Sequence, residues 1–430
     1  MKTDNPTVAM ETENPSVTVA PLINGPRLWD RHRAMAKIGA TGKGGVNRQA
    51  LTPDDTEGRR LLLDWAAARG YTATIDPIGN LFIRRPGANA KLSPVMTGSH
   101  LDTQPTGGKF DGVFGVLAGF EVLETLDDFG VVTERPTELV VWMNEEGSRF
   151  RPLTMGSAVA AGAIPLEHAL AILDGKGISV NEALTEQIAQ LPPLQRRPLG
   201  ASGFAYIEAH IEQGPVLEGA HCDIGIVSGI QGVHAYEVEV LGFEAHAGTT
   251  PLRHRKDALV AATALLAQIR SEVADPLDIL RFTVGRFEVS PGAFSTVPGK
   301  VTFNIDLRHP DPSHLLRTGD RILQICSGEI ENCSVSAKVL LRSSPVKFDD
   351  RVVAIVRDAA ARRKLAHMDI VSGATHDSKY TAGHTPTAMI FVPCEKGISH
   401  NEVEHAKDED LAAGAQILCD AMLAVMSEKL

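Results

Sequence analysis

The stretch Gly98–Gly112, GSHLDTQPTGGKFDG, places one histidine, two aspartates and four glycines directly after the apolar run SPVMT. The apolar run predicts a short buried strand, and the glycines allow the chain behind it to turn tightly. The residues from Asp111 to Leu126 carry apolar side chains at helical spacing. A strand, a loop with possible ligands and a helix form the unit of open α/β sheets, which bind ligands beyond the carboxyl ends of their strands.

Strands and helices alternate on both sides of this stretch. Tyr71–Gly87 predicts a hairpin, and Thr137–Met143 and Pro386–Pro393 each predict a buried strand. Thr56–Gly70 and Asp349–Lys364 predict helices. This alternation favours an α/β domain with a mostly parallel central sheet.

The pattern changes near Gly232, where HAYEVEVLGF alternates like a half-exposed strand. The segments that follow read as helix, strand, strand, helix and strand up to Ser344, which is the split β-α-β order of ferredoxin-like domains. We therefore expect residues 232–344 to form an inserted α+β domain, while residues 26–231 and 345–430 form the catalytic, metal-binding domain. Residues 1–25 are expected to be a mobile tail.

Composition excludes several classes of function. The 430 residues carry a net charge of -11 and only 5% aromatic side chains, which argues against nucleic acid and anionic membranes as partners. No apolar run approaches the ~20 residues that span a bilayer. The five cysteines form no CxxC pair, and the first residues lack the apolar core of a signal peptide. We therefore expect a cytoplasmic protein in a reducing compartment.

Four segments at predicted strand ends carry possible metal ligands. They are His100 with Asp111, Glu145 with Glu146, His210 in YIEAHIEQG, and His400 in KGISHNEVEH. Any one of these residues is more often structural, but the joint pattern of imidazoles and carboxylates suits Zn²⁺, Mn²⁺ or Co²⁺. A carboxylate can bridge two ions, and one of the adjacent glutamates could accept a proton from water. Asp102 could hold the His100 ring through its other nitrogen.

Several motifs along the chain resemble those of the hydantoinase/carbamoylase amidases. They are GSHLDTQPTGGKFDG, NEEGSRF, HIEQGPVLE, EAHAGTTP, VPGKVTFNIDLRHPD, SGATHDS and FVPCEKGISHNEVE. This family includes N-carbamoyl-L-amino acid hydrolases, β-ureidopropionases and allantoate amidohydrolases, and it belongs to the dinuclear metallopeptidase-like hydrolases. The resemblance runs in order from about Leu28 onward. It implies a metallopeptidase-like catalytic domain with an inserted lid and dimerisation domain.

The resemblance also implies roles for the candidate ligands. Two divalent ions would be bound, one by His100, Asp111 and His210, and the other by Asp111, Glu146 and His400, with Asp111 bridging. Glu145 would be the general base and Asp102 its supporting carboxylate. A histidine at position 210 is typical of the carbamoylase branch, because peptidase-type members place an acidic residue there.

The resemblance assigns further residues to the substrate. His246 would stabilise the oxyanion, Arg308 would hold the substrate carboxylate, and Gln213 and His376 would lie near the substrate. The inserted domain would also build a homodimer, in which His246 serves its own or the neighbouring subunit's site. Ser295 stands where family members commonly carry an asparagine that contacts the substrate, and serine offers fewer hydrogen-bonding groups.

These observations predict a metal-dependent hydrolase of a small ureido compound. The favoured substrate is an N-carbamoyl amino acid, of the L-α or β-alanine type, which yields the amino acid, CO2 and ammonia. Allantoate is the alternative substrate. Ser295 bears on the choice between the two, because the usual asparagine at this position helps to place the substrate. A non-catalytic metal-binding scaffold on the same fold is the alternative of another class, and the complete set of ligands with Glu145 argues against it. His210 disfavours a dipeptidase or aminoacylase.

Overall fold

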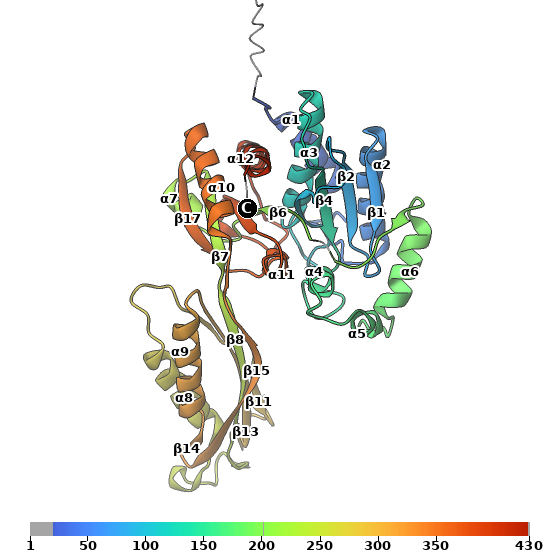
Figure 1. The fold of residues 1–430 in the computed structure, drawn as a ribbon. Helices are drawn as coiled ribbons and strands as arrows, with labels where there is room; N and C mark the ends of the chain where they lie inside the picture. The colour runs from blue at the N-terminus through green and yellow to red at the C-terminus, as the bar shows by residue number, and fades with distance from the viewer. Residues whose placement is uncertain (1–19, 201, 429–430) are drawn as a thin grey trace, which may run out of the picture.

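The computed structural model describes residues 20–200 and 202–428, whose strands form two large β-sheets and one two-stranded ribbon (Figure 1). Most of the tail expected over residues 1–25 lies outside the described residues. Within the described part, the N–H groups of Ile23 and Asn24 donate to side chains of Gln416 and Glu121. The chain is therefore already attached to the core when helix α1 (Gly25–Met35) begins.

The larger sheet has ten strands in the order β16-β7-β18-β6-β3-β4-β2-β1-β5, with β17 beside β7. The four central strands β18, β6, β3 and β4 are parallel neighbours. Their α/β arrangement confirms the expected mostly parallel central sheet. The strand bounds are β1 Thr72–Ile75, β2 Leu81–Arg85, β3 Val95–His100, β4 Thr137–Trp142, β5 Gln195–Arg196, β6 Ala205–Ile211, β7 Ile224–Ile230, β16 Val346–Lys347, β17 His367–Ser372 and β18 Thr387–Val392.

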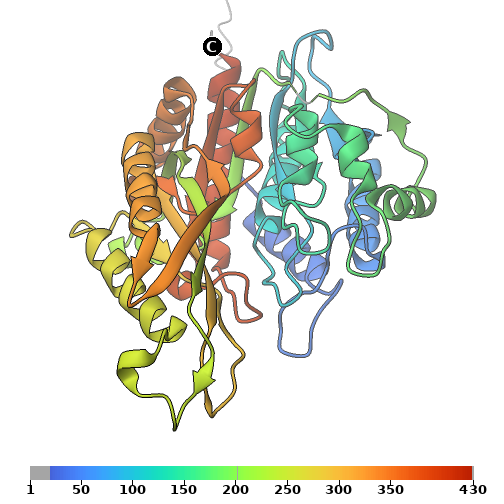
Figure 2. The same ribbon diagram turned by 90° about the horizontal axis from the view of Figure 1, so that it is seen from below.

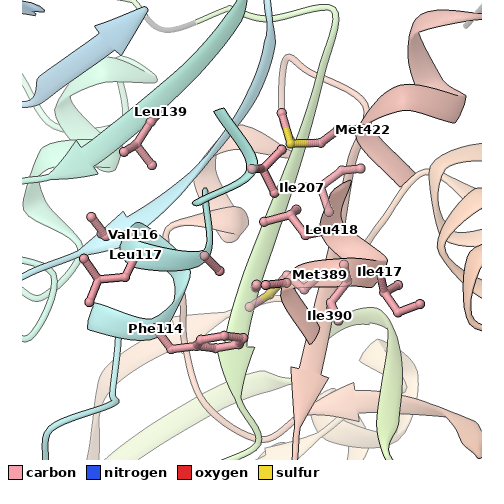
Figure 3. Close-up of a cluster of buried hydrophobic side chains, with 14 of the residues drawn as sticks. Phe114, Val116, Leu117, Leu139, Ile207, Met389, Ile390, Ile417, Leu418 and Met422 are labelled. Atoms are coloured by element: carbon pink, nitrogen blue, oxygen red, sulfur yellow. The ribbon is translucent and has the colours of Figure 1, made fainter. Parts of the chain in front are cut away.

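Helices cover this sheet and enclose the main core. α3 (Val113–Asp128) and α12 (Asp408–Met426) lie against the central strands, and Figure 3 shows their apolar side chains meeting those of β4, β6 and β18. The other helices of this part are α2 Pro53–Ala68, α4 Met155–Ala160, α5 Leu166–Ala171, α6 Val180–Gln190, α7 Val216–Ala220, α10 Asp350–Arg363 and α11 Ser378–Thr381, with the 3₁₀ turn η2 at Glu395–Gly397.

Helix α3 is buried along its whole length from Val113 to Leu126, although it contains two glutamates. Arg27 of α1 forms hydrogen bonds with Glu121, and Arg69 at the end of α2 donates to Glu124 at 2.8 Å. Buried carboxylates are tolerated when they are paired in this way. These ion pairs therefore fix α1 and α2 against the helix that begins at the candidate site.

The second sheet is antiparallel and lies beside the first (Figure 1). The chain passes from the first sheet to the second between β7 and β8, and it returns between β15 and β16. Its strands are β8 Gly232–Leu241, β10 Arg281–Thr283, β11 Phe287–Ser290, β13 Lys300–His309, β14 Gly328–Ile330 and β15 Cys333–Ser343. α8 (Ala258–Glu272) and α9 (Pro312–Ile325) pack on one of its faces, as Figure 2 shows from below. A separate ribbon pairs β9 (Ala245–His246) with β12 (Thr296–Val297), near the 3₁₀ turn η1 at Leu252–His254.

One strand expected in this region is two strands in the structure. The expected strand LRFTVGRFEVS is interrupted between Thr283 and Phe287, and both halves pair with β13. At this interruption, the backbone N–H of Arg286 donates a hydrogen bond to the side-chain carbonyl of Asn304 at 2.6 Å. None of the helices within the described ranges combines the length and apolar character that a membrane span needs.

Candidate metal centre

The first group of possible ligands lies where two parallel strands meet the start of α3. His100 is the last residue of β3, His210 belongs to the adjacent β6, and Asp111 lies in the loop before α3. One ligand atom from each lies within 4.8 Å of the others. The Asp111 Oδ1 atom is 3.3 Å from His210 Nε2 and 4.0 Å from His100 Nε2.

A second group forms on the other oxygen of the same aspartate. Asp111, Glu146 and His400 also offer ligand atoms within 4.8 Å of one another. His400 Nε2 lies 3.2 Å from Asp111 Oδ2 and 3.4 Å from Glu146 Oε2. The structure thus brings all five ligand candidates together, with the two oxygens of Asp111 facing different groups.

Two glycines of the opening stretch are required by close contacts. Gly112 has a φ of +67°, and a Cβ placed on it would lie 2.3 Å from the His100 ring. A Cβ on Gly108 would lie 2.0 Å from the Glu404 carboxylate. Such distances are far inside van der Waals contact, so only glycine permits this approach of backbone to side chain.

Asp102 contacts both residues for which a role was expected of it, His100 and Glu145. Its side chain accepts the N–H groups of Glu145 at 3.2 Å and Glu146 at 3.1 Å. The His100 ring instead bonds through Nδ1 to the main-chain carbonyl of Asp102 at 2.9 Å, because the chain turns directly after β3. Asp102 therefore orients the loop that carries both glutamates, and its backbone orients the histidine.

The carboxylates of the site carry strongly shifted pKa values. Burial, together with Asp377 and Glu146, raises the pKa of Glu145 well above its usual range. Burial and the charge of Asp111 raise the pKa of Glu146 to about 8. Asp111 is the exception: burial opposes ionisation, yet its bonds to His210 and His400 lower its pKa well below the usual range.

This crowding of buried acids fits a bound cation. Asp102, Asp111 and Glu145 are buried side by side, and within residues 20–200 and 202–428 no lysine or arginine forms an ion pair with them. Isolated carboxylates are costly to bury unless they are paired or bind metal. A mixed set of imidazoles and carboxylates is the donor set that Zn²⁺ and similar ions prefer. The residues present therefore fit divalent metal.

Two residues at the site, Glu404 and Ser399, were not predicted from the sequence. Glu404 is buried and accepts the N–H groups of Phe110 at 2.9 Å and Asp111 at 3.1 Å. The Ser399 hydroxyl lies 2.9 Å from Glu404 and 3.0 Å from Asp111 Oδ2. The signal available in the sequence was the second glutamate of HNEVEH, but its partners are almost 300 positions away in the chain.

Gln213 was expected at the substrate, and in the structure it donates to Asp111 Oδ2 at 2.9 Å.

A small cavity of about 180 Å³ opens onto the ligands and is partly lined by Arg308 and His376. Arg308 comes from β13 of the second sheet, where Asp306 and the Gly373 carbonyl hold its guanidinium. His376 packs edge-on against His210, with ring centroids 4.5 Å apart. His246 and Ser295 do not line this cavity. They lie in and beside the β9–β12 ribbon, where the His246 ring accepts the N–H of Gly248.

The chain is similar in sequence and structure to several known proteins. Residues 96–424 match the peptidase family M20/M25/M40. An N-carbamoyl-L-amino-acid amidohydrolase from Rhizobium meliloti is 41% identical over 406 residues, which cover 93% of this chain and 96% of that protein. An allantoate amidohydrolase from Escherichia coli is 34% identical and covers 89% of this chain and 94% of its own length. A solved hydantoinase/carbamoylase family amidase from Burkholderia multivorans has a TM-score of 0.88 at 44% identity, covering 95% of this chain and 100% of that one.

Proposed function

The chain belongs to the peptidase family M20/M25/M40 and, within it, to the hydantoinase/carbamoylase amidases, and we propose that it hydrolyses the carbamoyl group of N-carbamoyl-L-amino acids. The products are the amino acid, CO2 and ammonia. The observation that carries this proposal is the pair of ligand groups that meet on Asp111, with Glu145 and Arg308 lining the same cavity.

The residues present would hold two divalent ions, which are zinc, manganese or cobalt. His100, Asp111 and His210 form one set, and Asp111, Glu146 and His400 form the other. When bound, such ions supply Lewis-acid chemistry, which activates water and polarises a carbonyl.

The remaining steps belong to side chains of this protein. Glu145 takes a proton from water and returns it to the leaving nitrogen, which suits a buried carboxyl whose pKa is raised. Asp102 keeps the Glu145 loop in place through its two bonds to backbone N–H groups. The Arg308 guanidinium also lines the cavity, where Asp306 holds it in place, and its positive charge would bind the substrate carboxylate.

Replacing the base tests this assignment. A Glu145→Gln variant keeps the shape of the side chain but cannot accept a proton. Turnover of N-carbamoyl-L-amino acids should fall by ~10²–10⁴-fold while the protein retains its metal. Glu186→Gln, on the exposed face of α6, is the matched control. A Glu145→Gln protein with full turnover would refute the mechanism.

We further infer that residues 232–344 act as a lid and as the dimerisation domain, beside a catalytic domain formed by residues 26–231 and 345–430. Arg308 already extends from this second sheet to the cavity. His246 and Ser295 do not reach the cavity of their own chain, which supports a role for them after closure or in a neighbouring subunit. Phe243, at 68% exposure, and Phe294, fully exposed, leave apolar surface for a partner. The five free cysteines support a cytoplasmic location.

Allantoate is a second candidate substrate. The Escherichia coli relative named above supports it, and Ser295 bears on the choice between the two substrates. Comparing ammonia release from allantoate and from N-carbamoyl-L-amino acids separates the two. A clear preference for allantoate would replace the favoured substrate and keep the reaction type.

A further inference from the structure

A second cavity, of about 430 Å³, lies on the other side of the metal-binding loop. It is bounded by α1, by the loop around Gly44 and Gly45, and by Lys109 and Phe110, which directly precede Asp111. Among the described residues, none lines both this cavity and the cavity at the metal ligands. It is therefore a separate site, and the proposed reaction does not use it.

Aromatic rings form one wall of this cavity, in which Trp29 is half-buried and Phe110 is only 3% exposed. The rings of Trp29 and Phe110 are stacked, with centroids 6.0 Å apart and planes 14° apart. The His32 ring lies 5.5 Å from Phe110 and is only 2% exposed. Neither nitrogen of His32 has a hydrogen-bond partner among the described residues, and burial lowers the pKa of His32 to about 3, so the ring is neutral. Such a wall suits an apolar, planar group.

The charged residues around the wall are all basic. Arg33, Lys37 and Lys109 line the cavity, and no aspartate or glutamate is among its described lining residues. This differs from the chain as a whole, which carries a net charge of -11. Arg33 is partly neutralised by Asp30. Lys37 and Lys109 form no ion pair within the described part of the chain, so their charges remain available.

We propose that this cavity binds a small organic anion with a flat apolar body, such as an aromatic carboxylate or sulfonate. Its ring would pack against the half-buried Trp29, which is itself stacked on Phe110, and its charged group would lie near Lys37 and Lys109. Stacking and charge complementarity together select this class of ligand over neutral or cationic compounds of the same shape. The proposal is independent of the proposed hydrolysis, because it needs none of the residues assigned to catalysis.

Calorimetric titration of the metal-loaded protein tests the proposal with three compounds of matched shape. They are 1-naphthoate, the neutral 1-naphthylmethanol and the cationic 1-naphthylmethylamine. Saturable binding of 1-naphthoate is expected, with the alcohol at least ~tenfold weaker, or about 1.4 kcal/mol, and the amine weaker still. Absence of saturable binding in the millimolar range, or equal binding of the three compounds, would overturn the proposal.

Variants locate the bound anion. The double variant Lys37→Gln/Lys109→Gln should weaken 1-naphthoate at least ~tenfold, whereas Lys91→Gln/Lys364→Gln, which removes the same charge elsewhere, should not. Ala36→Phe should fill the cavity and abolish binding without changing the melting temperature. Metal content is measured in each case, because Lys109 is close to Asp111. Unchanged affinity in both the double variant and Ala36→Phe would place the anion elsewhere and refute this site.

Discussion

Asp111 is the residue on which both ligand groups depend. Its Oδ1 atom faces His210, and its Oδ2 atom faces His400 and accepts hydrogen bonds from Gln213 and Ser399. Glu404 in turn accepts the backbone N–H of Asp111. The position of one carboxylate is therefore fixed by segments that lie far apart in the sequence.

Glu404 provides a test of this arrangement at the scale of one residue. Glu404→Ala leaves the N–H groups of Phe110 and Asp111 buried without an acceptor, which should cost about 2 kcal/mol in the free energy of unfolding. The metal retained after dialysis should fall as well. Glu404→Gln keeps an oxygen acceptor and should recover most of both losses. Full metal content and unchanged stability in Glu404→Ala would contradict this role.

Residue type and position predicted which candidate ligands the structure brings together, but not the groups that support them. His100, His210 and Glu146 could be selected because imidazoles and carboxylates at strand ends converge in an α/β sheet. Glu404 and the carbonyl of Asp102 act on backbone groups and the histidine ring through local geometry, which residue type alone does not reveal.

At the scale of elements, α3 connects the site to the core. Leu117 lies in this helix and is fully buried. Leu117→Ala removes apolar contacts and leaves a cavity, so the free energy of unfolding should fall by ~2–5 kcal/mol. Leu173→Ala, at a site 60% exposed, should change it by less than ~0.5 kcal/mol. Urea denaturation of the metal-free variants measures both, and equal effects would contradict the packing of α3.

Long elements were predictable and short ones were not. The hairpin β1–β2 and the helix α3 follow the spacing of their apolar residues, and the strands β3 and β4 follow continuous apolar runs. β9 and β12 have two residues each, too few for any periodicity, and only pairing with each other defines them. The break between β10 and β11 depends on a contact with Asn304 from another strand.

At the scale of the whole molecule, the exposed half of β15 bears on assembly. β14 pairs only with Cys333–Val335, and Val339, Leu340 and Leu341 are each 44–52% exposed. An exposed apolar edge strand favours pairing with another chain. We expect sedimentation to give about twice the 46.0 kDa chain mass, and Leu340→Asp to shift it toward one chain. A monomeric parent protein would contradict the proposed dimer.

At the same scale, we expect removal of bound metal to lower the stability of the protein. Without a cation, the buried carboxylates around Asp111 repel one another, and protons must replace the missing charge. Chelation should therefore lower the melting temperature. Addition of Zn²⁺ at about 100 times its Kd should raise the free energy of unfolding by about 2.7 kcal/mol. In an Asp111→Asn variant, chelation should lower the melting temperature much less. Identical melting of the chelated and metal-loaded parent protein would contradict metal binding at this site.

The protein is expected to hydrolyse a carbamoyl group with divalent metal that the residues around Asp111 would hold. The most direct measurement is ammonia release from metal-stripped protein, before and after addition of Zn²⁺, Mn²⁺ or Co²⁺. The compounds are several N-carbamoyl-L-α-amino acids, one D-enantiomer, N-carbamoyl-β-alanine and allantoate. Ammonia release from the N-carbamoyl-L-amino acids only after metal is added is the predicted result. Silence toward every compound, with two ions bound per chain, would contradict the account.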